Sequence, residues 1–216
     1  MGDLTSEIAE RLIDIGAVGF QPQAPIAFKS GILSPIYVDN RQVPFHPLVW
    51  RVVIDGFKQR MQMEQIRPHV IAGIETAGIP HSAALAFSLQ VPSVFVRKEA
   101  KDHGTKKRVE SGDVHGKRVL LIEDHISTGG SSLAGVDSLR AEGAVVDHCM
   151  ATTSYGFGEA ADMFGAASVK LHVLVTLPTI LEVARSKGHL GEAEFAVLSD
   201  WASDPRGWAA RQGLAQ

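Results

Sequence analysis

The sequence predicts an α/β fold with a mostly parallel central sheet and helices on both of its faces. Short apolar runs alternate with helical segments from residue 69 onward, as expected for strands that are buried on both faces. Glycine is frequent, with 21 residues, while aromatic residues make up only 6%. This balance suits an α/β protein with many tight turns better than an aromatic-rich β-sandwich. The length of 216 residues fits one domain with at most a small appendage.

The N-terminal part of the chain divides into two predicted helices and an extended segment. A helix over about residues 4–15 is indicated by apolar residues that share one face, and Gly16 follows it as a C-cap. Residues 17–45 contain four prolines and are predicted to form short extended pieces. Pro47 fits the first turn of a second helix, which continues to about Met61.

Strands and helices then alternate. The predicted strands cover 69–73, 92–97, 118–124, 144–153 and 170–176, and the predicted helices lie near 79–89, 131–143, 158–164 and 179–187. Residues 98–117 separate two strands without helical periodicity, and a loop of that length in a compact domain is usually functional or mobile. Residues 191–216 are weakly patterned, with one short helix predicted near 192–200.

The charge distribution points to a small anionic ligand. The net charge of −3 gives no support for a nucleic-acid-binding protein, which is usually basic overall. Residues 97–108, RKEAKDHGTKKR, nevertheless carry +4, which leaves −7 on the rest of the chain. An acidic protein with one basic strip suits a small anion. We therefore expect no nucleic-acid partner.

Cysteine usage and hydropathy predict the compartment. Cys149 is the only cysteine, so no intrachain disulfide is possible, and a reducing cytoplasm is the natural interpretation. The opening residues, MGDLTSEIAERL, are too acidic and polar for a signal peptide. No apolar run approaches the ~18–20 residues of a membrane helix. We expect a cytoplasmic protein with no membrane partner.

The most informative motif is LLIEDHISTGGSS, residues 120–132. In open α/β sheets, ligands bind beyond the carboxyl ends of the strands. Glycines let the backbone approach a phosphate closely, and the N–H groups and dipole of a following helix favour an anion. Glu123 and Asp124 would repel a phosphate, so they suit sugar hydroxyls or Mg²⁺ instead. The motif therefore predicts a site for a phosphorylated sugar.

The same stretch closely resembles the phosphoribosyl pyrophosphate motif of the type I phosphoribosyltransferases. Residues 28–42, FKSGILSPIYVDNRQ, resemble the N-terminal signature of the orotate phosphoribosyltransferases. Residues 96–104, VRKEAKDHG, resemble their catalytic flexible loop, and residues 73–86 look like their pyrophosphate-side loop. The resemblance runs from about residue 5 to residue 190, with the motifs in the same order and spacing.

This resemblance implies a type I phosphoribosyltransferase-like fold and an enzyme of pyrimidine (UMP) synthesis. Such enzymes transfer the 5-phosphoribosyl group from phosphoribosyl pyrophosphate to orotate, giving orotidine 5′-monophosphate and pyrophosphate. They require Mg²⁺, which is expected to be held by substrate and water rather than directly by protein ligands. The implied division is an N-terminal helix and hood over the base site (1–45), a core (46–190) with a mobile loop (98–117), and a C-terminal tail (191–216).

The resemblance also implies roles for residues that bind phosphoribosyl pyrophosphate. Glu123 and Asp124 match the residues that bind the ribose hydroxyls, and Lys101 matches the catalytic lysine of the mobile loop. Lys101 and Asp124 are the expected catalytic residues. In the family, the loop reaches the neighbouring subunit's site, so a homodimer with loop 97–108 crossing over is implied. The full set expected to bind this substrate is Arg97, Lys98, Lys101, His103, Glu123, Asp124, Ser127, Thr128, Gly129, Gly130 and Ser131.

A smaller set of residues is expected around the base. Tyr37 falls where the family has an aromatic residue that stacks on the pyrimidine, and its alternative is an ordinary core position in a strand. Arg41 either points into the site or pairs with an acid. The residues expected to contact orotate are Lys29, Ser30, Gly31, Tyr37 and Ser127.

The sequence departs from the family pattern at several positions. His125 replaces a small apolar residue. We expect it to be hydrogen-bonded rather than to titrate near neutral pH against Asp124, so that His125→Val changes activity only a few-fold and alters only its pH profile. Ala77 lies where some members have a lysine for the pyrophosphate. Many members carry an Asp-Arg pair where this chain has residues 153–156, TSYG, so the orotate carboxylate loses its obvious partner.

Two other functions stay open from the sequence. One is a phosphoribosyltransferase for another base, against which the 28–42 signature argues. The other is a non-catalytic regulator that binds phosphoribosyl pyrophosphate, against which the Lys101 loop argues. A dinucleotide fingerprint near residue 156 lacks its acidic partner, and a hydrolase elbow near residue 131 lacks a supporting His/Asp pair.

Overall fold

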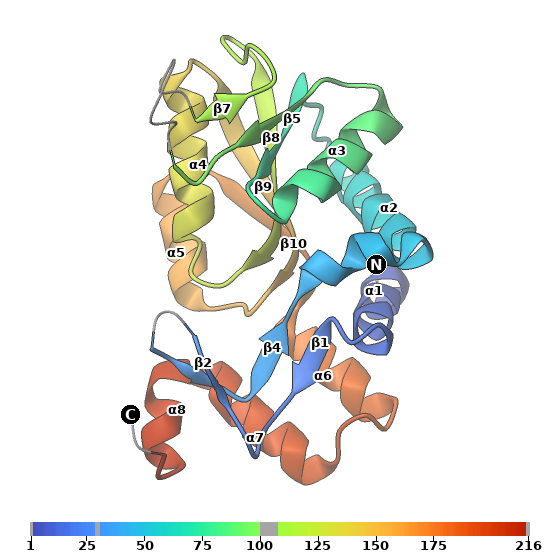
Figure 1. Cartoon of the computed structure of the whole chain (residues 1–216), viewed down its shortest axis with the longest axis vertical. Helices are drawn as coiled ribbons and strands as arrows, with labels where there is room; N and C mark the ends of the chain where they lie inside the picture. The colour runs from blue at the N-terminus through green and yellow to red at the C-terminus, as the bar shows by residue number, and fades with distance from the viewer. Residues whose placement is uncertain (1, 29–30, 100–107, 215–216) are drawn as a thin grey trace.

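The computed structural model describes residues 2–28, 31–99 and 108–214, and its centre is a six-stranded sheet (Figure 1). The strand order is β10-β9-β8-β5-β6-β7, and every neighbouring pair is parallel except β6–β7. This confirms the predicted α/β fold with a mostly parallel sheet. The strands are β5 (Val70–Ile74), β6 (Ser93–Val96), β7 (Val109–Glu110), β8 (Arg118–Ile126), β9 (Val145–Ser154) and β10 (Lys170–Thr176).

Helices cover both faces of this sheet, as predicted. Along β8, Leu120 and Ile122 point into one core, while Val119 and Leu121 point into the other, as the two-residue period of a strand requires. The first core is closed by α1, α2, α3 and α6, and the second by α4 and α5, on the opposite side in Figure 1. The helices of the core are α1 (Gly2–Asp14), α2 (Pro47–Met63), α3 (Gly78–Leu89), α4 (Gly130–Ala141), α5 (Gly158–Ala166) and α6 (Leu177–Ser186).

The extended N-terminal pieces form a small hood beside the main sheet, in the lower half of Figure 1. Strand β1 (Val18–Phe20) pairs antiparallel with β4 (Ile36–Val38), and β2 (Ile26–Ala27) with β3 (Leu33–Ser34). A 3₁₀ helix, η1 (Asn40–Phe45), then leads into α2. We use "hood" for this segment, residues 18–45. The short extended pieces that the prolines predict are confirmed.

The C-terminal segment contains the helix predicted near 192–200 and a second helix that the sequence did not indicate. These are α7 (Glu192–Ser203) and α8 (Pro205–Arg211), and they pack under the hood (Figure 1). Trp201 and Trp208 are almost completely buried, and the Trp201 indole N–H donates to the Leu33 carbonyl oxygen at 2.8 Å. The rings of Phe28, Tyr155, Phe157 and Trp201 form one aromatic cluster. These partners are remote in sequence, so local patterning could not reveal them.

The segment 98–117 also contains more structure than its sequence predicts. Val109 and Glu110 form β7, which pairs antiparallel with β6 at the sheet edge. Val109 and Val114 are buried in the core that α4 and α5 close. Two paired residues are too few to show a strand period, which is why the sequence gives no sign of β7. The loop proper therefore ends before Val109.

Candidate active site

Glu123 and Asp124 lie near the carboxyl end of β8, which extends two residues further than predicted. Glu123 is only 6% exposed. Its Oε1 accepts the Asp124 backbone N–H at 3.1 Å, and its Oε2 accepts the Ser132 hydroxyl at 3.3 Å. The start of α4 therefore fixes the first acid of the pair, while the second is held through its backbone.

The two carboxyl groups are electrostatically strained in the absence of a partner. Burial raises the pKa of Glu123 well above its ordinary value, and the negative charge of Asp124 raises it further. Burial also raises the pKa of Asp124. When two adjacent carboxyl groups are withdrawn from water, ionising both of them is unfavourable. The pair is consequently suited to a ligand that donates hydrogen bonds or brings positive charge.

The turn after β8 is shaped for close backbone approach. Gly129 is the N-cap of α4 and has φ +89°, in the left-handed region that favours glycine. A Cβ at this position would lie 2.8 Å from the Phe164 ring. No side chain caps the start of α4, so its first N–H groups stay open to an anion. The predicted Ser-Thr-Gly-Gly turn is thus an anion-binding geometry next to the acid pair.

A cavity of about 440 Å³, which we call the strand-end cavity, opens beside these acids. It collects side chains from the hood, from the β5–α3 turn, from the residue pair after β6 and from β8–α4. Four of the predicted site residues meet in it: Lys98, Glu123, Asp124 and Ser131. Its full lining is Arg41, Glu75, Thr76, Ala77, Lys98, Glu123, Asp124, His125 and Ser131.

The β5–α3 turn approaches the acid pair closely because Gly78 has no side chain. A Cβ on Gly78 would lie 2.5 Å from the Ile122 carbonyl oxygen and 3.4 Å from Glu123 Oε1. Glu75 also ties this turn to the segment after β6, because its Oε2 accepts the Lys98 backbone N–H at 3.0 Å. Three turns from different parts of the sequence thus meet at one edge of the sheet.

Asn40 clamps the hood to this strand edge, a contact that sequence reasoning missed. It is fully buried, and its Nδ2 donates to the Asp124 carbonyl oxygen at 2.7 Å and to Thr153 Oγ1 at 2.6 Å. The partners lie 84 and 113 residues away in the chain. The position of Asn40 within the 28–42 signature is the only sequence signal that could have drawn attention to it.

Arg41 does both things that its sequence position left open. It lines the strand-end cavity, and it pairs with Asp39 through Nε at 2.5 Å and Nη2 at 2.8 Å. The same Nη2 donates to the Tyr37 hydroxyl at 2.7 Å. Asp39 raises the pKa of Arg41, and Arg41 in turn lowers the pKa of Asp39. Tyr37 is 37% exposed, so it is not a core residue of the strand.

Comparison with known proteins identifies the family. The phosphoribosyl transferase domain model matches residues 42–182. Orotate phosphoribosyltransferases of Coxiella burnetii and Halalkalibacterium halodurans are 38% and 40% identical, over 94% and 92% of this chain and 97% and 94% of their own lengths. The chain belongs to the orotate phosphoribosyltransferase family. The resemblance of the sequence motifs is therefore confirmed.

Solved structures agree with this family assignment. The orotate phosphoribosyltransferase of Aeropyrum pernix superposes with a TM-score of 0.75 at 30% identity, over 85% of this chain and 99% of that one. The UMP synthase of Leishmania donovani superposes with a TM-score of 0.81 at 25% identity, over 92% of this chain but only 42% of that longer protein. The phosphoribosyltransferase-like fold expected from the motifs is likewise confirmed.

His125 of this family member is half-buried and hydrogen-bonded. Its Nδ1 lies 2.8 Å from Thr153 Oγ1, and its ring packs edge-on against Tyr155 with 4.4 Å between centroids. Burial lowers the pKa of His125 to about 4, so the imidazole is neutral at physiological pH. The expected hydrogen bond is confirmed, and the lowered pKa argues against titration near neutral pH. His125 and Asn40 therefore contact the same Thr153 hydroxyl.

The remaining predicted site residues lie in different surroundings. Arg97 faces Glu110 at 3.8 Å on the β6–β7 edge and is not part of the strand-end cavity lining. Thr128 lines a second hollow of about 280 Å³, whose walls include Ile32, Phe157 and Arg206. Arg206 comes from the C-terminal helices, so the sequence gave no reason to consider it. Lys29, Ser30, Lys101 and His103 lie outside the described residues.

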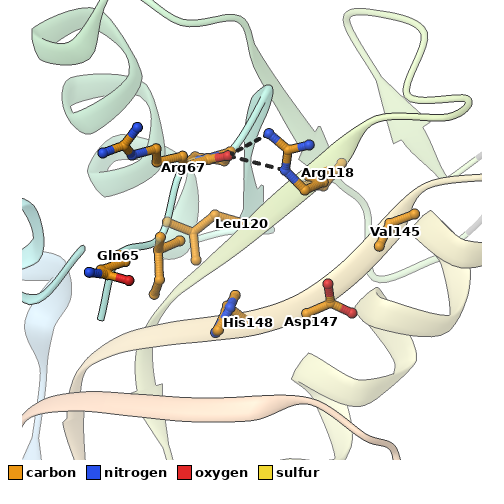
Figure 2. Close-up of a pocket in the computed structure, with 10 residues that line it drawn as sticks. Gln65, Arg67, Arg118, Leu120, Val145, Asp147 and His148 are labelled. Atoms are coloured by element: carbon orange, nitrogen blue, oxygen red, sulfur yellow. Dashed lines mark hydrogen bonds between the residues drawn. The ribbon is translucent and has the colours of Figure 1, made fainter. Parts of the chain in front are cut away.

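A further cavity lies at the other end of the strands, where β8 and β9 begin (Figure 2). It measures about 300 Å³, and its lining includes Arg67, Arg118, Asp147 and His148. The Arg118 guanidinium is held by two hydrogen bonds to the Arg67 carbonyl oxygen, at 3.2 and 3.3 Å. None of the predicted site residues that the structure describes lines this cavity, so we place the chemistry at the strand-end cavity.

Outside the gaps at 29–30 and 100–107 and the chain ends, no group of three or more His, Cys, Asp or Glu side chains is arranged to hold a metal ion. Over the same ranges, no helix combines the length and apolar character that crossing a membrane requires.

Proposed function

We propose that this chain transfers the 5-phosphoribosyl group of phosphoribosyl pyrophosphate to orotate, with orotidine 5′-monophosphate and pyrophosphate as products. The observation that carries the proposal is the strand-end cavity, in which buried Glu123 and its neighbour Asp124 lie directly beside a helix start that no described side chain caps. Family membership supplies the substrates, since the relatives are orotate phosphoribosyltransferases.

The phosphoribosyl half of the substrate would bind between the acid pair and α4. Glu123 and Asp124 would accept hydrogen bonds from the ribose 2′- and 3′-hydroxyls, which relieves their mutual repulsion. Ser127, Thr128, Gly129, Gly130 and Ser131 would cradle the 5′-phosphate against the open N–H groups. The placement of Ser131 in the cavity supports the second assignment.

The pyrophosphate would leave toward the basic loop. Lys98 lines the cavity, and Arg97 lies next to it in the chain. Lys101 and His103 would approach from the same segment, with Lys101 as the catalytic lysine. We also propose a homodimer in which loop 97–108 reaches the neighbouring site. A strip of charge +4 can neutralise a leaving group that carries several negative charges.

The base would lie under the hood. Lys29, Ser30 and Gly31 would cover it, and the Tyr37 ring would stack on the pyrimidine, with Ser127 near the base. The partial exposure of Tyr37 supports this role, because a stacking ring has to present a face to the ligand. Its hydroxyl is held by Arg41, so the ring orientation is fixed before the base arrives.

The cavity also fits the Mg²⁺ ion that the family implies. A divalent cation near the acid pair would favour the ionised forms of Glu123 and Asp124, whose pKa values are raised without it. The ion would supply charge neutralisation to the bound pyrophosphate group. We propose that substrate and water hold it, with the acids nearby, rather than a set of direct protein ligands.

The reaction is a displacement at the anomeric carbon. A bond forms between N1 of orotate and C1′ of the ribose, and N1 gives up its proton to the pyrophosphate or to water. The C1′–O bond to pyrophosphate breaks, and its electron pair stays on the departing oxygen. The chain contributes by holding two anions together, by meeting the charge that develops on the leaving group, and by excluding water. Closure of loop 97–108 over a base that the hood covers would exclude water.

The test is an ultraviolet assay with the purified protein, Mg²⁺, phosphoribosyl pyrophosphate and orotate. Loss of orotate absorbance that requires all three components is the expected result. If another base replaces orotate in releasing pyrophosphate, the specificity is different; binding of phosphoribosyl pyrophosphate without any turnover would indicate a regulator. We propose a cytoplasmic location, in keeping with the single, buried thiol of Cys149.

A further inference from the structure

Residues 153–156, at the end of β9 next to β8, cannot supply a cation for orotate in this chain. Thr153 and Ser154 are buried polar residues at the end of β9, and Tyr155 is buried in the aromatic cluster. No basic side chain occurs in residues 153–156. Orotate is a carboxylate at neutral pH, and burial of an unpaired charge is costly. Another group must therefore meet this carboxylate.

Arg41 lines the strand-end cavity and has hydrogen-bond donors that no described residue uses. Tyr37, Asp39 and Arg41 alternate along the chain and meet through their side chains. Three of the five guanidinium N–H groups are engaged by Asp39 and Tyr37. The two on Nη1 have no hydrogen-bond partner among the described residues. The side chain is 64% exposed although Asp39 restrains it.

The balance of charges in the strand-end cavity also indicates that Arg41 is the group that meets the orotate carboxylate. Three carboxylates line it, from Glu75, Glu123 and Asp124, against two described cations, Arg41 and Lys98. Lys98 belongs to the segment that follows β6, on the pyrophosphate side. Arg41 is the cation that the hood contributes, next to the ring that we expect to stack on the base.

We propose that Arg41 is the residue that selects orotate, by donating charge-assisted hydrogen bonds from the two free N–H groups of Nη1 to the orotate carboxylate. Asp39 and the Tyr37 hydroxyl hold the guanidinium in place, so little side-chain entropy is lost when the carboxylate binds. Arg–carboxylate pairs of this kind are strong and directional. The inference rests on the proposed placement of the base against Tyr37.

The test compares ligands with and without the carboxylate. Arg41→Gln and Arg41→Lys are assayed for kcat, for KM of orotate and of phosphoribosyl pyrophosphate, and for competitive inhibition by uracil, which lacks the carboxylate. We expect KM for orotate to rise by about 10–100-fold in Arg41→Gln, the range of a lost charge-assisted pair. Inhibition by uracil and KM for phosphoribosyl pyrophosphate should stay within about three-fold. Arg41→Lys should recover only part of the loss, because a lysine keeps the charge but cannot be held by Asp39 and Tyr37 in the same planar geometry.

Two further variants distinguish an effect on orotate recognition from an effect on folding. Tyr37→Phe keeps the ring but frees the guanidinium, so it should raise KM for orotate by a smaller factor and leave uracil inhibition unchanged. Arg11→Gln breaks an exposed Arg11–Glu7 pair on α1 and should change neither constant. Thermal unfolding of each variant shows whether it is folded.

The other outcomes would overturn the inference. A rise in KM for phosphoribosyl pyrophosphate alone would place Arg41 on the pyrophosphate. Equal weakening of orotate and uracil would make it a general base-site residue. An unchanged KM for orotate in Arg41→Gln, with active wild type, would refute only the role of Arg41; a wild type that does not convert orotate would instead refute the proposed function.

Discussion

The clamp between the hood and the active-site strand should depend on Asn40. Asn40→Ala removes two buried hydrogen bonds, to the Asp124 carbonyl oxygen at 2.7 Å and to Thr153 Oγ1 at 2.6 Å. Each such bond contributes about 0.5–1.5 kcal/mol net, and buried groups that lose their partner add about 1–3 kcal/mol. We expect the free energy of unfolding to fall by about 2–4 kcal/mol.

Urea unfolding measures this loss. For a slope near 2 kcal/mol/M, the midpoint should fall by about 1–2 M. Gln42→Ala is the matched control, because Gln42 belongs to the same 3₁₀ helix and its amide makes one exposed bond, to the Gly16 carbonyl oxygen at 3.4 Å. We expect this control to change stability by less than about 0.5 kcal/mol.

A double-mutant cycle assigns the effect to the Asn40–Thr153 contact. Thr153→Val removes the hydroxyl, and the double variant should be more stable than the sum of the single losses predicts, by about 1–2 kcal/mol. Additive losses would mean that the two side chains do not interact. A loss below about 0.5 kcal/mol in Asn40→Ala would refute the clamp itself. KM for phosphoribosyl pyrophosphate should also rise, since Asn40 positions the Asp124 backbone.

Three further predictions concern other parts of the site. Lys101→Ala should lower turnover by orders of magnitude while barely changing the melting temperature, and full turnover would exclude a role for the loop lysine. Gly129→Ala should cost about 1–3 kcal/mol of stability in urea unfolding and weaken phosphoribosyl pyrophosphate binding, because a Cβ would meet Phe164 at a φ of +89°; wild-type behaviour would show that the turn relaxes. His125 has a pKa of about 4 in the folded chain, below the ordinary 6.5, so it contributes stability above pH 6.5 that is lost as the pH falls toward 4. Between pH 7 and 5.5 this loss is about 1 kcal/mol, which His125→Val should remove while orotate turnover changes only a few-fold, and an unchanged pH dependence of unfolding would contradict the buried neutral imidazole.

Local sequence patterns were sufficient for the core of the fold. The apolar runs that became β5, β8, β9 and β10 are buried on both faces, so their composition alone marks them as strands of a covered sheet. The two tryptophans of α7 and α8 show the limit. Trp201 is buried by Leu33 and by the rings of Phe28, Tyr155 and Phe157, so its environment depends on contacts with remote segments. β7 is too short to have a pattern of its own.

The same division applies to the site. The order of strand, acid pair, glycine turn and helix determined where Glu123, Asp124 and the phosphate-binding turn would lie, because neighbours in sequence stay neighbours at a strand end. Only the tertiary structure decided that Asn40 contacts Asp124 and Thr153, and that Arg41 both pairs with Asp39 and faces the cavity. These contacts join segments up to 113 residues apart, and their geometry depends on how the hood packs on the sheet, which no local pattern encodes.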